Sequence, residues 1–259
     1  MIKVLVSGAA GRMGREVVKA ISQQEDMTLV GAVDVREIGK DAGELAGVGR
    51  LGIAIEGSLD ESLKRAKPDI MVDFTTPASV KENVRKAMEN KVIPVVGTTG
   101  LKNEDIEEIK KWAEEFGVGA FIAPNFSLGA NLMMRIAKQV AKYFPAVEII
   151  ELHHEKKLDA PSGTAIRTAQ LLSEGRELSP DEEAQPSRGD ARWGVRIHSV
   201  RLPGLVAHQE IIFGGQGETL TIRHDAPSRE CYMPGVITAI RKSLGLKEVV
   251  VGLDKLLGL

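Results

Sequence analysis

The first 125 residues alternate short apolar runs with longer segments in which apolar residues recur every three or four positions. The apolar runs are IKVLVSG, MTLVGAVD, DIMVDFTTP, VIPVVGTTG and GAFIAPNFS, and each is typical of a β-strand. Between the first two runs, Met13, Val17 and Ile21 are spaced four apart, which places them on one face of a helix. Strand–helix–strand repeats with strands apolar on both faces predict a parallel sheet covered by helices.

Two further helices are expected in this region. The segment PASVKENVRKAMEN predicts a helix with Thr76 as its N-cap and Pro77 in its first turn. The segment NEDIEEIKKWAEEF predicts another helix, capped by Asn103.

The pattern changes after residue 125. A helix (NLMMRIAKQVAKYF), a strand (AVEIIELHH) and a second helix (SGTAIRTAQLLSEG) are followed by a charged stretch from about 174 to 192, which we expect to be an exposed loop. Three strand-like runs follow, VRIHSVRL, HQEIIFGG and ETLTIRHDA, and the GQG between the last two predicts a hairpin. The terminal segment PGVITAIRKSLGL is helical again, and its apolar spacing suits packing onto the first domain.

Three glycines lie between the first strand and the first helix. Gly8, Gly11 and Gly14 permit a tight turn and let backbone N–H groups approach a pyrophosphate at the helix N-terminus. Asp34 ends the second strand 20 residues after Gly14, where a carboxylate would accept hydrogen bonds from an adenosine ribose. The spacing G-x-x-G-x-x-G departs from the commoner G-x-G-x-x-G, and a glycine-rich turn without a ligand is the alternative.

These features predict an α/β protein of two domains. The N-terminal domain is Rossmann-like, with a parallel sheet that binds a dinucleotide, and comprises residues 1–125 completed by 234–259. The second domain, residues 126–233, is a smaller α+β domain with an open mixed sheet that binds substrate.

The cofactor is expected to be NADH, because Asp34 should repel the 2′-phosphate of NADPH. Arg36 is close enough in sequence to weaken that preference and admit NADPH. Residues 97–100 (GTTG) and 123–126 (APNF) end two strands at the edge where parallel sheets bind ligands, and we expect them to face the nicotinamide half. Ordinary loop turns are the alternative for both.

The stretch ELHHEKKLDAPSGTA, residues 151–165, gathers proton donors and anion-binding groups. In a strand, His153 and His154 would point to opposite faces, so a metal site is not expected. Histidine has an ordinary pKa of about 6.5 and exchanges protons near neutral pH, which makes His153 a candidate proton donor.

The same stretch offers a receptor for carboxylate groups, formed by an ammonium, hydroxyls and the backbone of a helix start: Lys157, Ser162, Gly163 and Thr164. A solvated charged loop before a helix is the alternative. A nucleotide site together with an anion receptor and proton donors predicts hydride transfer to a small acidic substrate, because hydride addition leaves electron density that a proton must meet.

Composition excludes several other classes of function. A formal net charge of -2, with 27% charged residues, gives no support to nucleic acid as a partner, and no apolar run approaches a membrane span. The single cysteine, Cys231, excludes intrachain disulfides and multi-cysteine zinc sites, and a packed side chain is the alternative to a nucleophile there. The opening residues lack a signal-peptide pattern, so we expect a cytoplasmic protein.

These motifs together resemble the 4-hydroxy-tetrahydrodipicolinate (dihydrodipicolinate) reductase family. The resemblance is carried by ELHHEKKLDAPSGTA, GAAGRMG, VDFTTP, GTTG and APNFSLG, and by the segment from RGDARWG to HDAPSR. It implies NAD(P)H-dependent reduction of the cyclic 4-hydroxy-tetrahydrodipicolinate in lysine and diaminopimelate biosynthesis, by an enzyme that is usually a homotetramer formed through its second sheet.

The resemblance also implies roles for individual residues. His153 corresponds to the family's proton donor and acceptor, Lys157 to its proton donor, and His154, Gly163 and Thr164 to contacts with the substrate carboxylates. The expected cofactor contacts are Gly8, Ala9, Ala10, Gly11, Arg12, Met13, Asp34, Gly97, Thr98, Thr99, Ala123, Pro124, Asn125 and Phe126. Family members tend to accept both cofactors, and many have a basic residue directly after the ribose acid, where this chain has Val35.

Two rival functions remain at this point. A reductase of the same architecture that acts on another amino or imino acid would keep the glycine turn but has no reason to keep the whole His-Lys string. A nucleotide-sensing regulatory protein would bind NADH without consuming it and needs no clustered proton donors.

Overall fold

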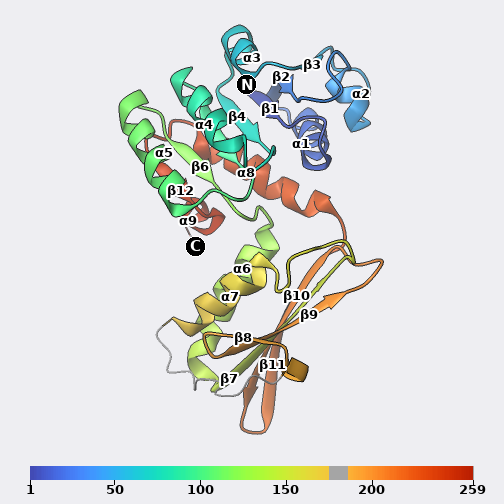
Figure 1. Cartoon of the computed structure of the whole chain (residues 1–259), viewed down its shortest axis with the longest axis vertical. Helices are drawn as coiled ribbons and strands as arrows, with labels where there is room; N and C mark the ends of the chain where they lie inside the picture. Colours follow the sequence, from blue (N-terminus) through green and yellow to red (C-terminus); the bar gives the residue numbers. More distant parts are fainter. Residues whose placement is uncertain (175–185, 259) are drawn as a thin grey trace. The chain divides into compact units, whose positions relative to one another are not determined.

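The structure, a computed structural model, describes residues 1–174 and 186–258. The chain divides into two compact units (Figure 1). The first consists of Met1–Ser127 and Tyr232–Leu259, and the second of Leu128–Cys231.

The first unit is built on a seven-stranded sheet in which every pairing is parallel. Its order is β12-β6-β5-β4-β1-β2-β3. The chain adds β2 and β3 on one side of β1 and then β4, β5 and β6 on the other side, which is the strand order of a doubly wound sheet. Buried strands need apolar side chains on both faces, and Val4, Leu5 and Val6 are fully buried as that requires. The strands are β1 (Ile2–Ser7), β2 (Met27–Val33), β3 (Ile55–Glu56), β4 (Ile70–Asp73), β5 (Ile93–Val96), β6 (Ala120–Ile122) and β12 (Val249–Val251).

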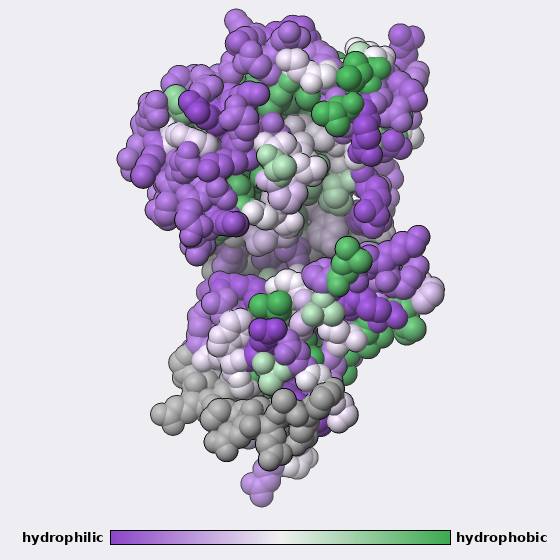
Figure 2. Space-filling model, in the orientation of Figure 1, coloured by the Kyte–Doolittle hydropathy of each residue, from purple (hydrophilic) through white to green (hydrophobic). Residues whose placement is uncertain are grey.

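Helices cover this sheet in two groups. One group is formed by α3 (Leu59–Ala66), α4 (Val80–Glu89) and α5 (Asn103–Phe116), which contact one another in turn. In the other, α1 (Arg12–Ser22) contacts α8 (Met233–Ser243), so this late helix packs in the first unit as its apolar spacing predicts. Two short helices, α2 (Ala42–Ala46) and α9 (Leu253–Leu257), complete the unit. Figure 2 shows mostly hydrophilic residues on the visible surface of these helices.

Two predicted helix starts are wrong. Thr76 is not the N-cap, because α4 begins at Val80 with Ser79 at the N-cap position, and the Thr76 hydroxyl lies 2.9 Å from Ser79 Oγ and caps no helix N–H. Asn103 is the first residue of α5, and the N-cap position belongs to Lys102, whose N–H donates to Asp105 Oδ2 at 2.9 Å. In both cases a competing local hydrogen bond moves the boundary.

The second unit is a five-stranded mixed sheet of order β11-β10-β7-β9-β8. Among its described strands, only β7 and β9 pair in parallel, and β10 and β11 form the predicted hairpin. One face packs against two helices through a core that includes Ile149, Ile211 and Phe213. The elements are α6 (Leu128–Val140), η1 (Ala141–Tyr143), β7 (Ala146–His153), α7 (Gly163–Ser173), η2 (Pro186–Arg188), β8 (Asp190–Arg192), β9 (Val195–Arg201), β10 (Ala207–Gly215), β11 (Glu218–Ala226) and η3 (Arg229–Tyr232).

The stretch from 174 to 192 is not wholly a loop. Its last part contains η2 and the edge strand β8, which pairs antiparallel with β9 and was missed because a three-residue strand carries almost no periodicity. Residues 175–185 of that stretch lie outside the described residues.

The predicted fold class, a parallel Rossmann-like sheet plus a second mixed sheet, is confirmed. Among the described residues, no helix is long and apolar enough to cross a membrane.

Candidate active site

The glycine turn that follows β1 is required by close backbone packing. Gly8 has φ +85°, and a Cβ there would lie 2.3 Å from Phe74 O. A Cβ on Gly14 would lie 2.0 Å from Gly8 O, and one on Gly11 would lie 3.1 Å from the same oxygen. No side chain other than hydrogen fits at Gly8 or Gly14, so the turn brings the start of α1 directly against the sheet.

The start of α1 suits an anion. Its first turn carries no acidic residue, and Gly11 at the N-cap provides no side-chain acceptor for the first N–H groups of the helix. These N–H groups carry the positive end of the helix dipole and are the donors that a pyrophosphate needs. Arg12 is exposed at this position.

Asp34 lies directly beside this turn. Its carboxylate is buried and accepts from Ala10 N at 3.0 Å through Oδ2 and from Arg36 N at 2.9 Å through Oδ1. A carboxylate has about four acceptor positions, so both oxygens keep capacity for ribose hydroxyls. The residues of the turn and Asp34 therefore fit the ribose and pyrophosphate of a dinucleotide.

The two residues after Asp34 differ in what they could offer a 2′-phosphate. Val35 is 86% exposed and apolar. Arg36 is also exposed, but its Nε lies 3.5 Å from Asp34 Oδ1, and its guanidinium lies 3.9 Å from where a Cβ of Gly11 would be. A cation is therefore present beside the ribose acid, supplied by the second following residue.

A buried carboxylate that the sequence did not single out supports the GTTG loop. Asp73, at the end of β4, is fully buried and accepts from Thr98 Oγ1 at 2.6 Å, from Thr75 Oγ1 at 2.8 Å and from Asn83 Nδ2 at 2.9 Å. Its backbone oxygen accepts from the N–H groups of Gly97 and Thr98. Thr98 is thus held below the loop surface, while Thr99 is exposed.

The APNF segment is divided between core and surface. Ala123 and Phe126 are buried, and the Phe126 ring lies 5.8 Å from the rings of both Phe74 and Phe121. Pro124 is exposed, and Asn125 Oδ1 accepts from Ser127 N at 2.8 Å. Ala123 and Phe126 therefore expose almost no surface, and Pro124 is the exposed residue of this segment.

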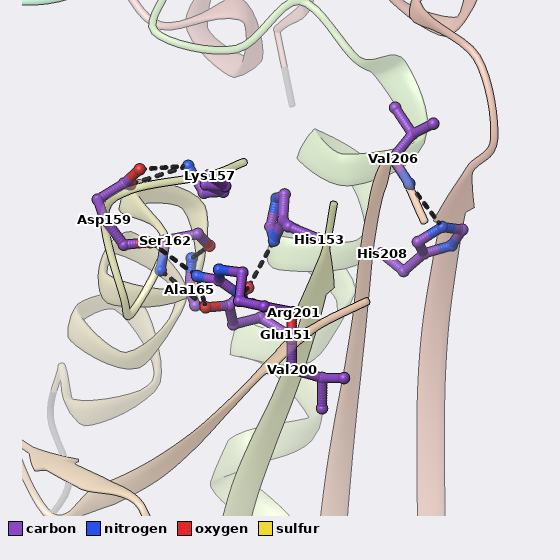
Figure 3. A network of polar contacts seen from close by, with 10 residues as sticks. All are labelled: Glu151, His153, Lys157, Asp159, Ser162, Ala165, Val200, Arg201, Val206 and His208. Carbon is purple, nitrogen blue, oxygen red and sulfur yellow. Dashed lines mark hydrogen bonds and ion pairs between the residues drawn. The ribbon is translucent and has the colours of Figure 1, made fainter. Parts of the chain in front are cut away.

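In the second unit, His153 is the last residue of β7 and is held by Glu151 (Figure 3). His153 Nδ1 lies 2.5 Å from Glu151 Oε2, and the Glu151 side chain is fully buried. Burial alone would raise the pKa of Glu151, but hydrogen bonds from His153, Arg201 and Ser199 outweigh it and lower that pKa to about 2. An ionised carboxylate can only accept, so Nδ1 of His153 carries the hydrogen and Nε2 is the nitrogen available to a ligand.

Arg201, from β9, forms a two-point ion pair with the same carboxylate. Its Nη1 lies 2.9 Å from Glu151 Oε2 and its Nη2 lies 2.8 Å from Oε1. Arg201 Nη2 also donates to Asp159 O at 2.7 Å, and Ser162 N donates to Glu151 Oε1 at 3.1 Å. One buried pair therefore ties together β7, β9, the loop after β7 and the start of α7.

Lys157 has an acidic neighbour. Its Nζ lies 2.7 Å from Asp159 Oδ1 and 2.9 Å from Oδ2, and its side chain is 21% exposed. The hydrogen bond from Lys157 lowers the pKa of the Asp159 carboxyl below its ordinary value. Figure 3 shows Lys157 and His153 on the same side of the Glu151–Arg201 pair.

The start of α7 separates structural from available groups. Ser162 is buried at the N-cap, where its Oγ accepts from Ala165 N at 3.2 Å. Gly163, the first residue of the helix, is exposed, and a Cβ there would meet nothing within 4 Å. Among the described glycines, Gly163 alone combines such open space with an ordinary φ, so the fold itself gives no reason for a glycine. A ligand that approaches the backbone closely would supply that reason.

The predicted site residues thus fall into two sets. All predicted cofactor residues lie at the carboxyl edge of the sheet in the first unit, and His153, His154, Lys157, Ser162, Gly163 and Thr164 lie together around the end of β7 and the start of α7. β7 ends at His153, so the two adjacent histidines do not share a strand. Within the described ranges, no cluster of three or more His, Cys, Asp or Glu side chains could hold a metal ion.

Sequence reasoning missed Glu151, Asp159, Arg201 and Asp73. Glu151 had a usable signal, because it precedes His153 by two residues and must share its face of the strand. Arg201 had none, since 50 residues separate it from Glu151.

Comparison with known proteins is consistent over the whole chain. The family model "Dihydrodipicolinate reductase, N-terminus" matches residues 2–126, and "Dihydrodipicolinate reductase, C-terminus" matches residues 129–257. The 4-hydroxy-tetrahydrodipicolinate reductase of Desulfitobacterium hafniense is 56% identical over 263 residues, covering 99% of this chain and 98% of its own. That of Moorella thermoacetica is 52% identical over 261 residues, with the same coverage.

One solved structure is similar as well. A dipicolinate-bound dihydrodipicolinate reductase from a Paenisporosarcina species superimposes with a TM-score of 0.85 at 42% identity, covering 98% of this chain and 99% of its own.

Proposed function

Since this chain belongs to the dihydrodipicolinate reductase family, we propose that its own residues carry out the reaction for which its relatives are named: NAD(P)H-dependent reduction of 4-hydroxy-tetrahydrodipicolinate to tetrahydrodipicolinate. The chain is an oxidoreductase of lysine and diaminopimelate biosynthesis, and we place its reaction in the cytoplasm. The assignment of residues rests on one observation: His153, Lys157 and the start of α7 are grouped around the Glu151–Arg201 ion pair.

The reaction is tested by following the absorbance of NADH and of NADPH while the substrate is generated in place from pyruvate and aspartate semialdehyde by the preceding synthase. Turnover with either cofactor supports the proposed reaction. Tight NADH binding without turnover would instead favour a different substrate or a nucleotide sensor.

The chemistry requires one hydride and one proton, and releases the 4-hydroxyl group as water. The nicotinamide cofactor supplies the hydride when it is bound. We assign two candidate donors for this proton. One is His153 Nε2, because Nδ1 is engaged by Glu151, and the other is Lys157, whose ammonium lies on the same side of the Glu151–Arg201 pair. Whichever group gives its proton is reprotonated from solvent, which both can reach because neither side chain is fully buried.

The substrate carboxylates are assigned to the groups around α7. His154, Lys157 and Thr164 supply side-chain donors, and Gly163 supplies a backbone N–H at the positive end of the helix. The related enzyme bound to dipicolinate, a planar dicarboxylate, supports a ligand of this class. Ser162 contributes chiefly as the N-cap that fixes this helix start.

Replacing Gly163 by alanine tests this assignment directly. We expect KM for the substrate to rise about tenfold to a hundredfold, the range for losing a hydrogen bond to a charged group, because the new methyl group would keep a carboxylate from the backbone N–H. The melting temperature should be unchanged or higher, since the Cβ meets open space and alanine favours a helix. Steady-state kinetics and thermal unfolding give both values, with Gln170→Ala on the exposed side of α7 as the control. An unchanged KM would remove Gly163 from the binding site.

We propose that NADH is the preferred cofactor and that NADPH is also accepted. Asp34 disfavours a 2′-phosphate, Val35 cannot pair with one, and the Arg36 guanidinium beside Asp34 can.

The Arg36→Ala variant should therefore separate the two cofactors. We expect KM for NADPH to rise about tenfold while KM for NADH changes less than about twofold, because the variant removes a phosphate partner and leaves Asp34 without its cation. Initial rates with each cofactor measure this, and Arg85→Ala, an exposed arginine paired with Glu89, is the control. Equal loss with both cofactors would contradict the assigned role.

We also propose that the first unit, with boundaries near 1–125 and 234–259, binds the cofactor and that the second, near 126–233, binds substrate and forms a homotetramer. The sheet face opposite the helices carries Ile150, Leu152, Val200 and Ile212, none of which is fully buried within the chain. Light scattering at a mass of four chains would support the homotetramer, and a lower mass for Ile150→Asp would support assembly through this face.

A further inference from the structure

Glu151 and Arg201 form an ion pair in direct contact with the histidine assigned to proton transfer. Both charged groups lie beneath the residue assigned to proton transfer, and Glu151 is fully buried. An isolated buried carboxylate is costly, and this one is stabilised by several donors: Arg201 at both oxygens, Ser162 N at Oε1, His153 at Oε2 and the Ser199 side chain.

The geometry decides which nitrogen of His153 can react. Glu151 Oε2 can only accept from His153 Nδ1, and this contact leaves Nε2 as the exchanging nitrogen. Without that partner the imidazole would rotate and populate both tautomers, and a misplaced proton donor loses much of its effect.

The charges also balance. Neutral His153 above the Glu151–Arg201 pair gives no net charge, and protonated His153 gives one positive charge. Glu151 alone would hold the proton on His153 tightly, and Arg201 opposes that effect by its two contacts with the same carboxylate. The pair can thus stabilise the imidazolium without preventing it from releasing its proton.

Other charged or titratable groups surround His153. They are the same in every variant of Glu151 or Arg201, so they do not account for a difference in proton release between those variants. His154 follows it in the chain, and the loop contributes Lys157 with Asp159. On β10, Ala207 is opposite His153, and the nearby strands carry His208, paired with Asp225, and His224. The basic residues of the packed helices are exposed or paired: Arg135, Arg167 and Lys138 with Glu174.

We propose that Glu151 is a positioning residue for the reaction, which fixes the tautomer of His153 and, with Arg201 as its counter-ion, balances the charge that His153 gains and loses. This inference rests on the proposed role of His153 in proton transfer. It also gives the partly exposed Arg201 a function beyond holding the loop together.

The first test uses the unaltered protein labelled with ¹⁵N at histidine. Long-range ¹H–¹⁵N spectra, assigned with His153→Asn, should show neutral His153 protonated at Nδ1, with Nε2 as the nitrogen that titrates. A neutral His153 protonated at Nε2 would overturn the proposal whatever the activity of the enzyme. Because this test needs no turnover, it separates failure of the inference from failure of the proposed function.

The second test compares two variants whose effects should be opposite. In Glu151→Gln the negative charge is lost, so His153 should release its proton more easily, and the limb of kcat that falls with rising pH should move to lower pH by about one unit. In Arg201→Met the carboxylate is uncompensated, so the same limb should move to higher pH by about one unit. In Arg201→Lys the charge is kept, and the limb should stay near its original position.

A purely structural role predicts something different. Glu151→Gln and Arg201→Met would then lose activity or stability, while the limb of kcat that falls with rising pH would stay in place or move in the same direction in both variants. That result would overturn the proposal. Circular dichroism and NADH binding confirm that each variant is folded. If neither variant folds, the tautomer and titration of His153 in the unaltered protein decide the question.

Discussion

Replacing His153 by alanine is expected to lower kcat by about two to four orders of magnitude, which is the usual contribution of a positioned acid or base. The affinity for NADH should change by less than about threefold, because every predicted cofactor contact belongs to the first unit and His153 to the second. The physical reason is that Nε2 of His153 is the nitrogen left available when Nδ1 binds Glu151. Steady-state kinetics and NADH fluorescence titration measure the two effects separately.

His198→Ala provides a matched control for this prediction. His198 lies on β9 and binds Glu148 at 2.7 Å, so it is a second strand histidine held by a glutamate and lies outside the proposed proton-transfer site. Because His198 pairs with Ile150 on the sheet face proposed for assembly, light scattering should show the same mass for this variant. Its removal should leave kcat within about threefold of the original. Collapse of NADH binding with turnover preserved in His153→Ala would show that the role of His153 is misassigned.

Replacing Lys157 by alanine is expected to lower kcat/KM by about a hundredfold to a thousandfold, with both kcat and KM affected. Two losses combine: the substrate loses a positive partner for a carboxylate, and the reaction loses a proton donor. The variant also leaves Asp159, which Lys157 binds at 2.7 Å, as a negative charge without its lysine partner beside the proposed carboxylate site. Steady-state kinetics at saturating cofactor measure the change.

Two further variants separate these contributions. Lys156→Ala removes an exposed neighbouring lysine and should leave the kinetics unchanged. The double variant Lys157→Ala with Asp159→Asn should recover part of the loss in KM, because the repulsion is gone, but none of the loss in kcat. Kinetics of Lys157→Ala that match the unaltered enzyme would remove this lysine from the site.

The candidate nucleotide site and the candidate proton-transfer site differ in what holds them. The nucleotide turn carries a local constraint, since Gly14 is forced by Gly8 O in the same turn, although Gly8 itself is forced by Phe74 O, which is distant in the sequence. The proton-transfer site depends on charges brought together from distant segments. A single sequence displays the first kind of constraint more openly than the second.

The features that were predicted wrongly or missed also depend on tertiary contacts. Thr76 has the right residue type for an N-cap, but its hydroxyl instead interacts with Ser79 in a turn, and only the geometry of the turn decides between them. β8 was missed because its three residues are a strand only by pairing with β9. Asp34 and Arg36 were both visible in the sequence, yet that they lie in contact, which bears on cofactor choice, required the structure.

The sequence by itself determined the parallel sheet, the glycine turn and the candidate residues His153, His154, Lys157 and Ser162–Thr164, because periodicity, turn chemistry and the HHEKKLDAPSGT string are local. Only the tertiary structure decided how His153 is held: Arg201 comes from β9, 50 residues from Glu151, through the parallel register that pairs Leu152 with Val200 and His153 with Arg201. Strand register is set by packing of the whole sheet against α6 and α7, and no spacing in the sequence encodes which distant cation will neutralise a buried carboxylate.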